Sequence, residues 1–178
     1  MSDLHIDSTD FELPPTPDGV DVPVVAGDVD EGMPLALHAL LGWSRERRLP
    51  IVFVPGNHDY SGGELAIDLA TVVEHANGGV HVLDGKHMVV LVGVRFVGAT
   101  LWTDFEVFGD VERGVAIAKS FMPEFSEVTK AGDPITPEDL LAAHVEQRAA
   151  IERTLALPFD GPTVVVTHHA PHPRSLPN

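Results

Sequence analysis

The stretch Ile51-Val52-Phe53-Val54-Pro55-Gly56-Asn57-His58-Asp59 indicates how this chain folds. Its first four residues form a short apolar run that Pro55-Gly56 ends, which predicts a buried strand. The polar residues Gly56-Asn57-His58-Asp59 follow this strand directly. Ligands bind in the loops at the carboxyl ends of strands in open α/β sheets, so these residues are candidates for a functional site. A turn stabilised by the Asn57 side chain is the alternative interpretation.

Two further predicted strands end in polar residues in the same way. The strand Val22–Ala26 leads into Gly27-Asp28-Val29-Asp30, and the strand Thr163–Thr167 leads into His168-His169-Ala170-Pro171-His172. A fourth polar group, Asp3-Leu4-His5, lies near the N-terminus. Each group alone also fits a turn or a chance occurrence. Four metal-competent groups at one edge of a sheet, however, indicate a shared site.

The rest of the chain alternates helical and strand patterns, which predicts a single α/β domain over residues 1–178. A helix is expected from Thr136, which can cap it, through Pro137 at its first position to about Leu155. A hairpin turning near Gly93 predicts a mixed sheet. The other predicted elements are helices at Met33–Arg48 and Gly63–Ala76, an ambiguous segment that allows a helix around Val111–Phe121, and strands at Val80–Leu83, His87–Val92 and Val94–Leu101.

Composition excludes several classes of function. The 11 basic and 27 acidic residues give a net charge of −16, which argues against a broad basic groove for nucleic acid. Because there is no cysteine, disulfides, zinc–thiolate sites and a cysteine nucleophile are excluded. No apolar run approaches the ~20 residues that span a membrane, and the N-terminus lacks a signal-peptide pattern, so we expect a soluble cytoplasmic protein. The motifs of serine hydrolases and P-loop nucleotide hydrolases are absent from the sequence. The sequence does not predict an oligomeric state.

The four polar groups share one kind of chemistry. Asp, His and Asn provide oxygen and imidazole ligands, which suit manganese, iron, zinc or cobalt. Two such ions about 3.5–4 Å apart can clamp the attacking and leaving oxygens of a displacement at phosphorus. Asp28, at the centre of the pattern, could bridge both ions. These residue types therefore predict a two-metal site for a small phosphorylated substrate.

The order of these motifs resembles the calcineurin-like metallophosphoesterase superfamily. The resemblance rests on Asp-x-His at 3–5, Gly-Asp at 27–28, Gly-Asn-His-Asp at 56–59 and Thr-His-His-Ala-Pro at 167–171. The stretch Gly98–Phe105 is similar to a bacterial branch of the superfamily. The resemblance implies an α/β fold in which two mixed β-sheets pack as a sandwich flanked by helices, in four layers, with the metals at the strand ends.

The resemblance also implies a role for each matching residue. Two divalent metal ions are expected, manganese first, with iron, zinc, cobalt and nickel as alternatives. The implied catalytic residues are His58, which assists the leaving group, and Asp59, which orients His58. The implied metal ligands are Asp3 and His5 for the first ion, Asp28 as the bridge, and Asn57 and His168 for the second ion. His169 and Asp30 are expected to support these ligands, and Trp102 is expected to be core or cleft wall.

The expected activity is metal-dependent hydrolysis of a phosphomonoester or phosphodiester. Two departures from the superfamily pattern qualify this expectation. Only Met1 and Ser2 precede Asp3, so the usual strand before Asp-x-His is expected to be missing, which would leave neighbouring strands with unpaired backbone groups. No Gly-His-x-His follows His172, so each metal would lack one histidine, and His172 is a weak substitute. A non-catalytic or weakly active remnant that binds metal poorly is therefore the alternative.

Overall fold

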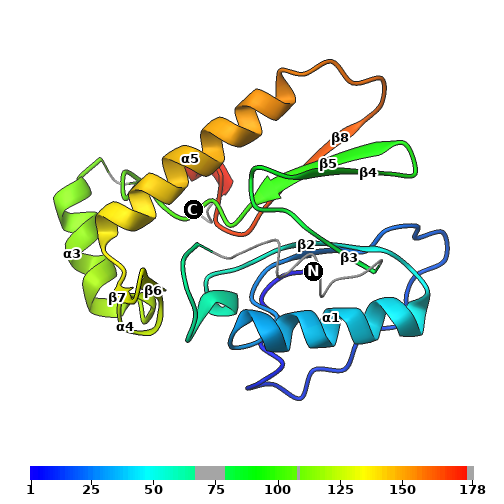
Figure 1. Cartoon of the computed structure of the whole chain (residues 1–178), viewed down its shortest axis with the longest axis horizontal. Helices are drawn as coiled ribbons and strands as arrows, with labels where there is room; N and C mark the ends of the chain where they lie inside the picture. Colours follow the sequence, from blue (N-terminus) through cyan, green and yellow to red (C-terminus); the bar gives the residue numbers. More distant parts are fainter. Residues whose placement is uncertain (67–78, 108, 176–178) are drawn as a thin grey trace.

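Two β-sheets pack face to face at the centre of the molecule (Figure 1). The computed structural model describes residues 1–66, 79–107 and 109–175. The first sheet has the order β1-β2-β3 and all its strands are parallel: β1 (Val24–Ala26), β2 (Ile51–Val54) and β3 (Val80–Val82). The second sheet has the order β4-β5-β8: β4 (Met88–Leu91) is antiparallel to β5 (Val94–Ala99), which is parallel to β8 (Thr163–Thr167). The predicted sandwich is confirmed, and its mixed strand directions lie in the second sheet.

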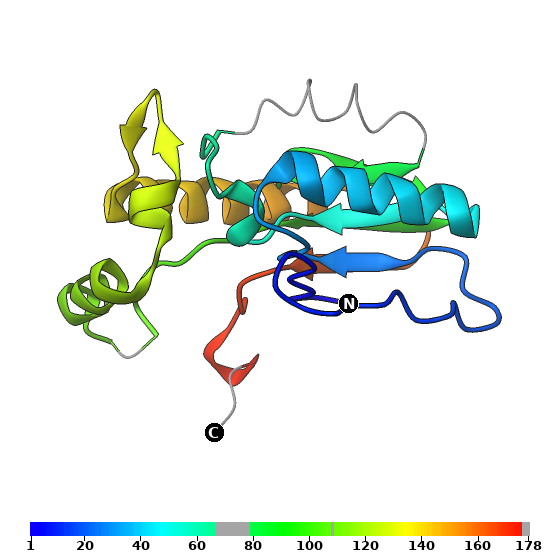
Figure 2. The same cartoon turned by 90° about the horizontal axis from the view of Figure 1, so that it is seen from below.

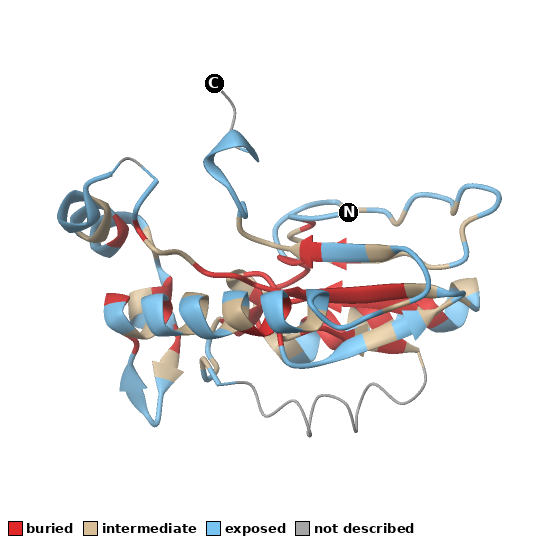
Figure 3. Cartoon of the chain, turned by 90° about the horizontal axis from the view of Figure 1, so that it is seen from above, coloured by how far each residue is buried: buried red, intermediate tan, exposed pale blue. Residues whose placement is uncertain are grey.

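The alternation of side chains along β2 explains the layers. Val52 and Val54 face the second sheet and belong to the apolar cluster between the two sheets. Phe53 points to the opposite face, where α1 (Met33–Arg47) packs. The helix α5 (Pro137–Leu155) covers the outer face of the second sheet. Helix, sheet, sheet and helix therefore form four layers (Figure 1), and α1 lies over the first sheet in the view from below (Figure 2). The buried residues concentrate in the strands and in the loops at one end of them (Figure 3).

The two long helices begin and end where their sequences predict. Thr136 and Asp139 form a capping box at the start of α5, with Pro137 in its first turn. The helix α1 ends at Arg47, its C-cap Arg48 adopts a left-handed conformation, and Pro50 follows two residues later. The shorter elements are the 3-10 helices η1 (His58–Tyr60) and η2 (Pro173–Ser175), the helices α3 (Val111–Phe121) and α4 (Glu124–Glu127), and the two-stranded pair β6 (Thr129–Lys130) and β7 (Asp133–Pro134). Among the described residues, no helix is long and apolar enough to cross a membrane.

The first residues of the chain lie along the open edge of β1. The Met1 amino group donates to the carbonyl of Val24 at 2.9 Å, and the N–H of Ala26 donates to the carbonyl of Met1 at 2.7 Å. Farther along, the N–H of Leu4 donates to the carbonyl of Asp28 at 2.7 Å. The expectation that this edge would be left with unpaired backbone groups is therefore wrong at these positions.

The helix predicted for Gly63–Ala76 does not begin at Gly63. Glu64 instead forms a β-bridge with Thr129, and its carboxylate accepts hydrogen bonds from the backbone of Ala131 and Gly132. Residues 67–76 of this prediction lie outside the described residues. The hairpin predicted near Gly93 is confirmed, with Val92 and Gly93 both at positive φ between β4 and β5.

Candidate metal centre

Asp28 occupies the centre of the candidate site, at the carboxyl end of β1. Its Oδ1 accepts a 2.9 Å hydrogen bond from the backbone N–H of His58. Its Oδ2 lies 3.7 Å from Nε2 of His5 and 3.4 Å from Nε2 of His168. Burial opposes ionisation, but the contact with His168 and the hydrogen bond from His58 hold the pKa of Asp28 below its ordinary value. A buried carboxylate between two imidazoles suits the bridging position expected for Asp28.

The imidazole of His168 has a polar contact at each nitrogen. Nδ1 lies 2.7 Å from the backbone carbonyl oxygen of Ala26, and Nε2 lies 2.9 Å from Oδ1 of Asn57. A proton on Nδ1 donates to the Ala26 carbonyl, which leaves Nε2 as the atom able to bind a cation. Burial opposes the charged ring, but the hydrogen bond and the charge of Asp28 raise the pKa of His168. Asn57 and His168, the two ligands expected for the second metal, therefore converge beside Asp28.

The two ligands expected for the first metal also meet Asp28. Asp3, His5 and Asp28 each offer one ligand atom, and these atoms lie within 4.8 Å of one another. All three residues adopt positive φ angles, of 54°, 43° and 52° respectively. Residues other than glycine rarely adopt this conformation, and such strain gathers at functional sites. The local backbone thus supports the assignment of these three residues to one site.

Two glycines allow the loops after β1 and β2 to touch. A Cβ atom on Gly27 would lie 2.5 Å from the backbone of Gly56 and 2.6 Å from Nδ1 of His168. A Cβ atom on Gly56 would collide with the Asp28 carboxylate. The Gly-Asp and Gly-Asn sequences therefore let the backbone of one loop pack directly on the other, which brings Asp28 and Asn57 together.

The ring of His58 contacts a carboxylate that the sequence did not single out. Nδ1 of His58 lies 2.7 Å from Oε1 of Glu31, and the ring of His5 stands edge-on to it with 4.8 Å between ring centres. Burial opposes the charged form, but the hydrogen bond with Glu31 and the nearby Asp28 carboxylate raise the pKa of His58. Glu31 lies three residues after Asp28, and its carboxylate at that spacing is the feature of the sequence that could have predicted the contact with His58.

Asp59 does not orient His58, and the expectation that it would is wrong. Its carboxylate is fully buried and accepts backbone hydrogen bonds from Gly56 at 2.7 Å, Asp28 at 2.9 Å and Val29 at 3.0 Å. Burial raises the pKa of Asp59 to about 6, although the hydrogen bonds from Gly56 and Val29 favour the charged form. Asp59 therefore fastens the loop after β2 to the loop after β1.

Comparison with known proteins agrees with this arrangement of motifs. Residues 2–177 match the calcineurin-like phosphoesterase family. The chain belongs to this family. Its fold is similar to the crystal structure of phosphopantetheinyl hydrolase from Mycobacterium tuberculosis, with a TM-score of 0.67 and 24% sequence identity, covering 96% of this chain and 67% of that chain. Comparison with curated protein sequences gave no match.

The calcineurin-like phosphoesterases are hydrolases that act on phosphoesters. Three more polar residues of this chain were candidates for the site. His169 is held by a 3.0 Å backbone hydrogen bond to Thr100, and its ring lies 5.0 Å from that of His168. Burial, together with the charge of His168, lowers the pKa of His169 to about 4, so this ring is neutral. Asp30 accepts a hydrogen bond from the N–H of Glu31. His172 is exposed and accepts a hydrogen bond from the N–H of Arg174, which favours a surface position over a ligand position.

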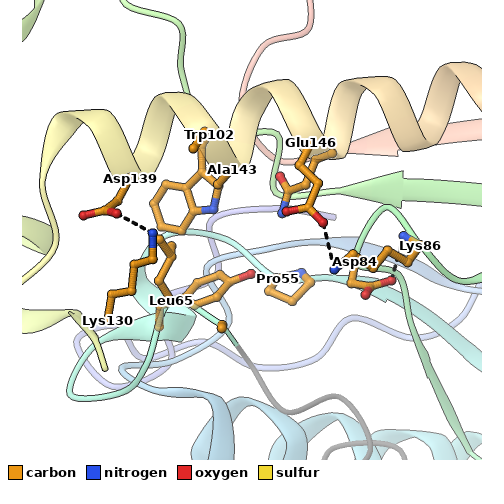
Figure 4. Close-up of a pocket in the computed structure, with 13 residues that line it drawn as sticks. Pro55, Leu65, Asp84, Lys86, Trp102, Lys130, Asp139, Ala143 and Glu146 are labelled. Carbon is orange, nitrogen blue, oxygen red and sulfur yellow. Dashed lines mark hydrogen bonds and ion pairs between the residues drawn. The ribbon is translucent and has the colours of Figure 1, made fainter. Parts of the chain in front are cut away.

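Trp102 lies between His169 and a pocket beside α5. The indole is 2% exposed, and its ring centre lies 5.8 Å from that of His169 and 5.1 Å from that of Tyr60. On its other side is a pocket of about 230 Å³ between α5 and Pro55 (Figure 4). Ion pairs between Lys130 and Asp139 and between Lys86 and Glu146 cross its rim. Trp102 is therefore both a core residue and a wall of this pocket.

Proposed function

We propose that this chain hydrolyses a phosphomonoester or phosphodiester with the help of two divalent metal ions, manganese first. The observation that carries the proposal is the position of the Asp28 carboxylate, with Oδ2 3.7 Å from His5 and 3.4 Å from His168. A carboxylate oxygen that faces imidazoles from two separate segments suits a ligand shared by two ions. Family membership supports phosphoester hydrolysis as the general reaction.

The chemistry of the side chains fits divalent cations. The site gathers carboxylate, carboxamide and imidazole groups, which are ligands for manganese and the related metals. Asp3, His5 and Asp28 would hold one ion, and Asp28, Asn57 and His168 would hold the other. Bound metals supply Lewis acidity and a water-derived nucleophile for attack at phosphorus. The Ala26 carbonyl, by holding the proton of His168 on Nδ1, keeps Nε2 available as a ligand.

His58 is assigned the proton transfer to the leaving group. Glu31 holds Nδ1 of the ring at 2.7 Å, so the opposite nitrogen, Nε2, is free to face the substrate. Its raised pKa keeps the ring protonated to a higher pH than an ordinary histidine. As the nucleophile derived from water attacks phosphorus and the ester P–O bond breaks, the departing oxygen takes the proton from Nε2 of His58. The proton that the attacking water gives up is released to solvent, from which His58 is protonated again. The products are the alcohol and inorganic phosphate from a monoester, or the alcohol and a phosphomonoester from a diester.

Release of nitrophenol from nitrophenyl phosphate and bis-nitrophenyl phosphate tests this function. The purified chain is first freed of metal with a chelator and then assayed with and without manganese. We expect turnover that depends on manganese and is abolished in Asp28→Ala. The exposed residue Asp18 provides a matched control, and Asp18→Ala should behave as wild type. Metal-independent turnover, or equal turnover in Asp28→Ala, would contradict the proposal.

A further inference from the structure

The side chain of Asn57 has a second partner besides His168. Its Nδ2 donates a short hydrogen bond to Oε1 of Glu124, the first residue of α4. Glu124 is 3% exposed, although an isolated carboxylate is costly to bury. Its other oxygen, Oε2, is buried without a hydrogen-bond partner among the described residues. A buried acid with one oxygen unsatisfied does not stabilise a core, so its presence beside Asn57 calls for a functional explanation.

Backbone contacts hold α4 and the adjoining β6 against the loop that follows η1. The N–H of Gly62 donates to the carbonyl of Glu127 at 2.9 Å, and the N–H of Leu65 donates to the carbonyl of Thr129 at 2.7 Å. The Ser61 hydroxyl also donates to the Glu127 carboxylate. Glu124 therefore reaches Asn57 from a fixed backbone rather than from a loose surface loop.

The orientation of the Asn57 carboxamide decides whether it can bind a cation. A carboxamide has one acceptor oxygen and one donor NH₂ group, and only the oxygen binds a metal ion. In the observed orientation Nδ2 faces Glu124 and Oδ1 faces His168. The reversed orientation would set the oxygen against the Glu124 carboxylate, acceptor against acceptor, and would point NH₂ toward the metal position.

We propose that Glu124 is a positioning residue that fixes the Asn57 carboxamide with its oxygen toward the second metal position. This inference rests on the two-metal function proposed above, because the orientation of Asn57 matters only if its oxygen binds a metal ion. Glu124 acts through Asn57 and needs no contact with the metal or the substrate. Loss of a partner that orients a metal ligand typically weakens metal affinity 10–100-fold.

Isothermal titration calorimetry of manganese binding to the metal-free chain tests the effect on metal affinity. Glu124→Leu keeps the side-chain volume but removes the acceptor, whereas Glu124→Gln keeps an acceptor oxygen. We expect Glu124→Leu to weaken the second binding event 10–100-fold and to leave the first unchanged. Glu124→Gln should stay close to wild type. Glu127→Gln, which makes the same charge change on the same helix, is the matched control and should also stay close to wild type.

Two outcomes of this titration would overturn the proposal. One is a Glu124→Leu chain that binds both ions as tightly as wild type. The other is a Glu124→Gln chain that loses the second ion to the same extent as Glu124→Leu, which would assign the effect to charge rather than to orientation. Because an unsatisfied buried acid adds little stability, we expect Glu124→Leu to melt within a few degrees of wild type.

A second measurement tests the contact in the metal-free wild-type chain. In the metal-free wild-type chain, the NH₂ protons of Asn57, assigned by their loss in Asn57→Ser, should exchange more slowly with solvent than those of an exposed carboxamide. Exchange at the rate of an exposed carboxamide would overturn the role of Glu124. Slow exchange in a chain that binds no manganese would instead contradict the proposed function, so the two failures can be told apart.

Discussion

Replacing Asp59 by alanine should destabilise the chain far more than the small change in side-chain size suggests. The Asp59 carboxylate joins two loops by accepting backbone hydrogen bonds from Gly56 at 2.7 Å, Asp28 at 2.9 Å and Val29 at 3.0 Å, with a longer one from Asp30 at 3.4 Å. In Asp59→Ala these donors lose their acceptor while they remain buried. The change also removes the fastening between the two loops that carry Asp28 and Asn57.

The size of the effect follows from the three shorter bonds. A buried polar group left without its partner costs about 1–3 kcal/mol, so three donors give about 3–9 kcal/mol before any relaxation. Water entering the space left by the carboxylate would satisfy part of this, and we therefore expect a loss of about 3–5 kcal/mol. Domains are typically stable by about 5–15 kcal/mol, so this is a large fraction of the total.

Urea denaturation in the presence of a chelator, monitored by circular dichroism, measures this loss of stability without a contribution from metal binding. With a denaturant dependence of about 2 kcal/mol per molar urea, the midpoint should fall by about 2 M. The exposed Asp18 provides the same chemical change away from the site, and Asp18→Ala should shift the midpoint very little. An Asp59→Ala midpoint equal to that of Asp18→Ala would refute the structural role given to this carboxylate.

Four other side chains have testable roles. Asp28→Ala should remove both metals together, because this carboxylate is assigned to both, and elemental analysis that finds full occupancy would contradict the bridge. His58→Ala should lower kcat by roughly 10²–10⁴-fold with metal content unchanged, and Glu31→Gln should lower kcat by a smaller factor. Steady-state kinetics would measure kcat, and elemental analysis would measure the metal content. The hydrogen bond from Lys130 and the cap at the start of α5 lower the pKa of Asp139 to about 2. Because the pKa of Asp139 is lowered in the folded state, its ionised carboxylate stabilises the fold at pH values above the ordinary carboxyl pKa. This stabilisation is lost as the pH falls through about 2. Asp139→Asn should therefore reduce stability by roughly 1 kcal/mol at pH 7 but hardly at all near pH 2, as thermal melts at both pH values would reveal.

The sequence predicted the strands and the meeting of the polar groups because those features depend on local patterns. The apolar run Ile51–Val54 is buried on both faces, and the glycines at 27 and 56 mark the loops that touch. The role of Asp59 was mistaken because it is adjacent to His58 in sequence. These residues lie in the 3-10 helix η1, where successive side chains point about 120° apart, so neighbours in sequence face different partners.

Two other features depended on contacts between distant segments. Glu64 begins a helical pattern, yet its carboxylate binds the backbone of Ala131 and Gly132, and this tertiary contact overrides the local preference. Glu124 lies 67 positions from Asn57, in a segment with no motif of its own. Neither contact has a periodicity or a turn signal that could have indicated it.

Asp28 and Asp59 show why one buried aspartate is assigned to metal and another to the scaffold. Both follow a buried strand within a few residues, and both are almost inaccessible to solvent. The oxygens of Asp59 are satisfied by the backbone N–H groups of Asp28, Val29 and Gly56. Asp28 has only Oδ1 held by such a group, whereas Oδ2 faces the imidazoles of His5 and His168, which must lose their protons to bind cations. A cation can therefore replace those protons at Asp28 without breaking a backbone hydrogen bond, whereas at Asp59 it would have to displace the hydrogen bonds that hold the two loops together.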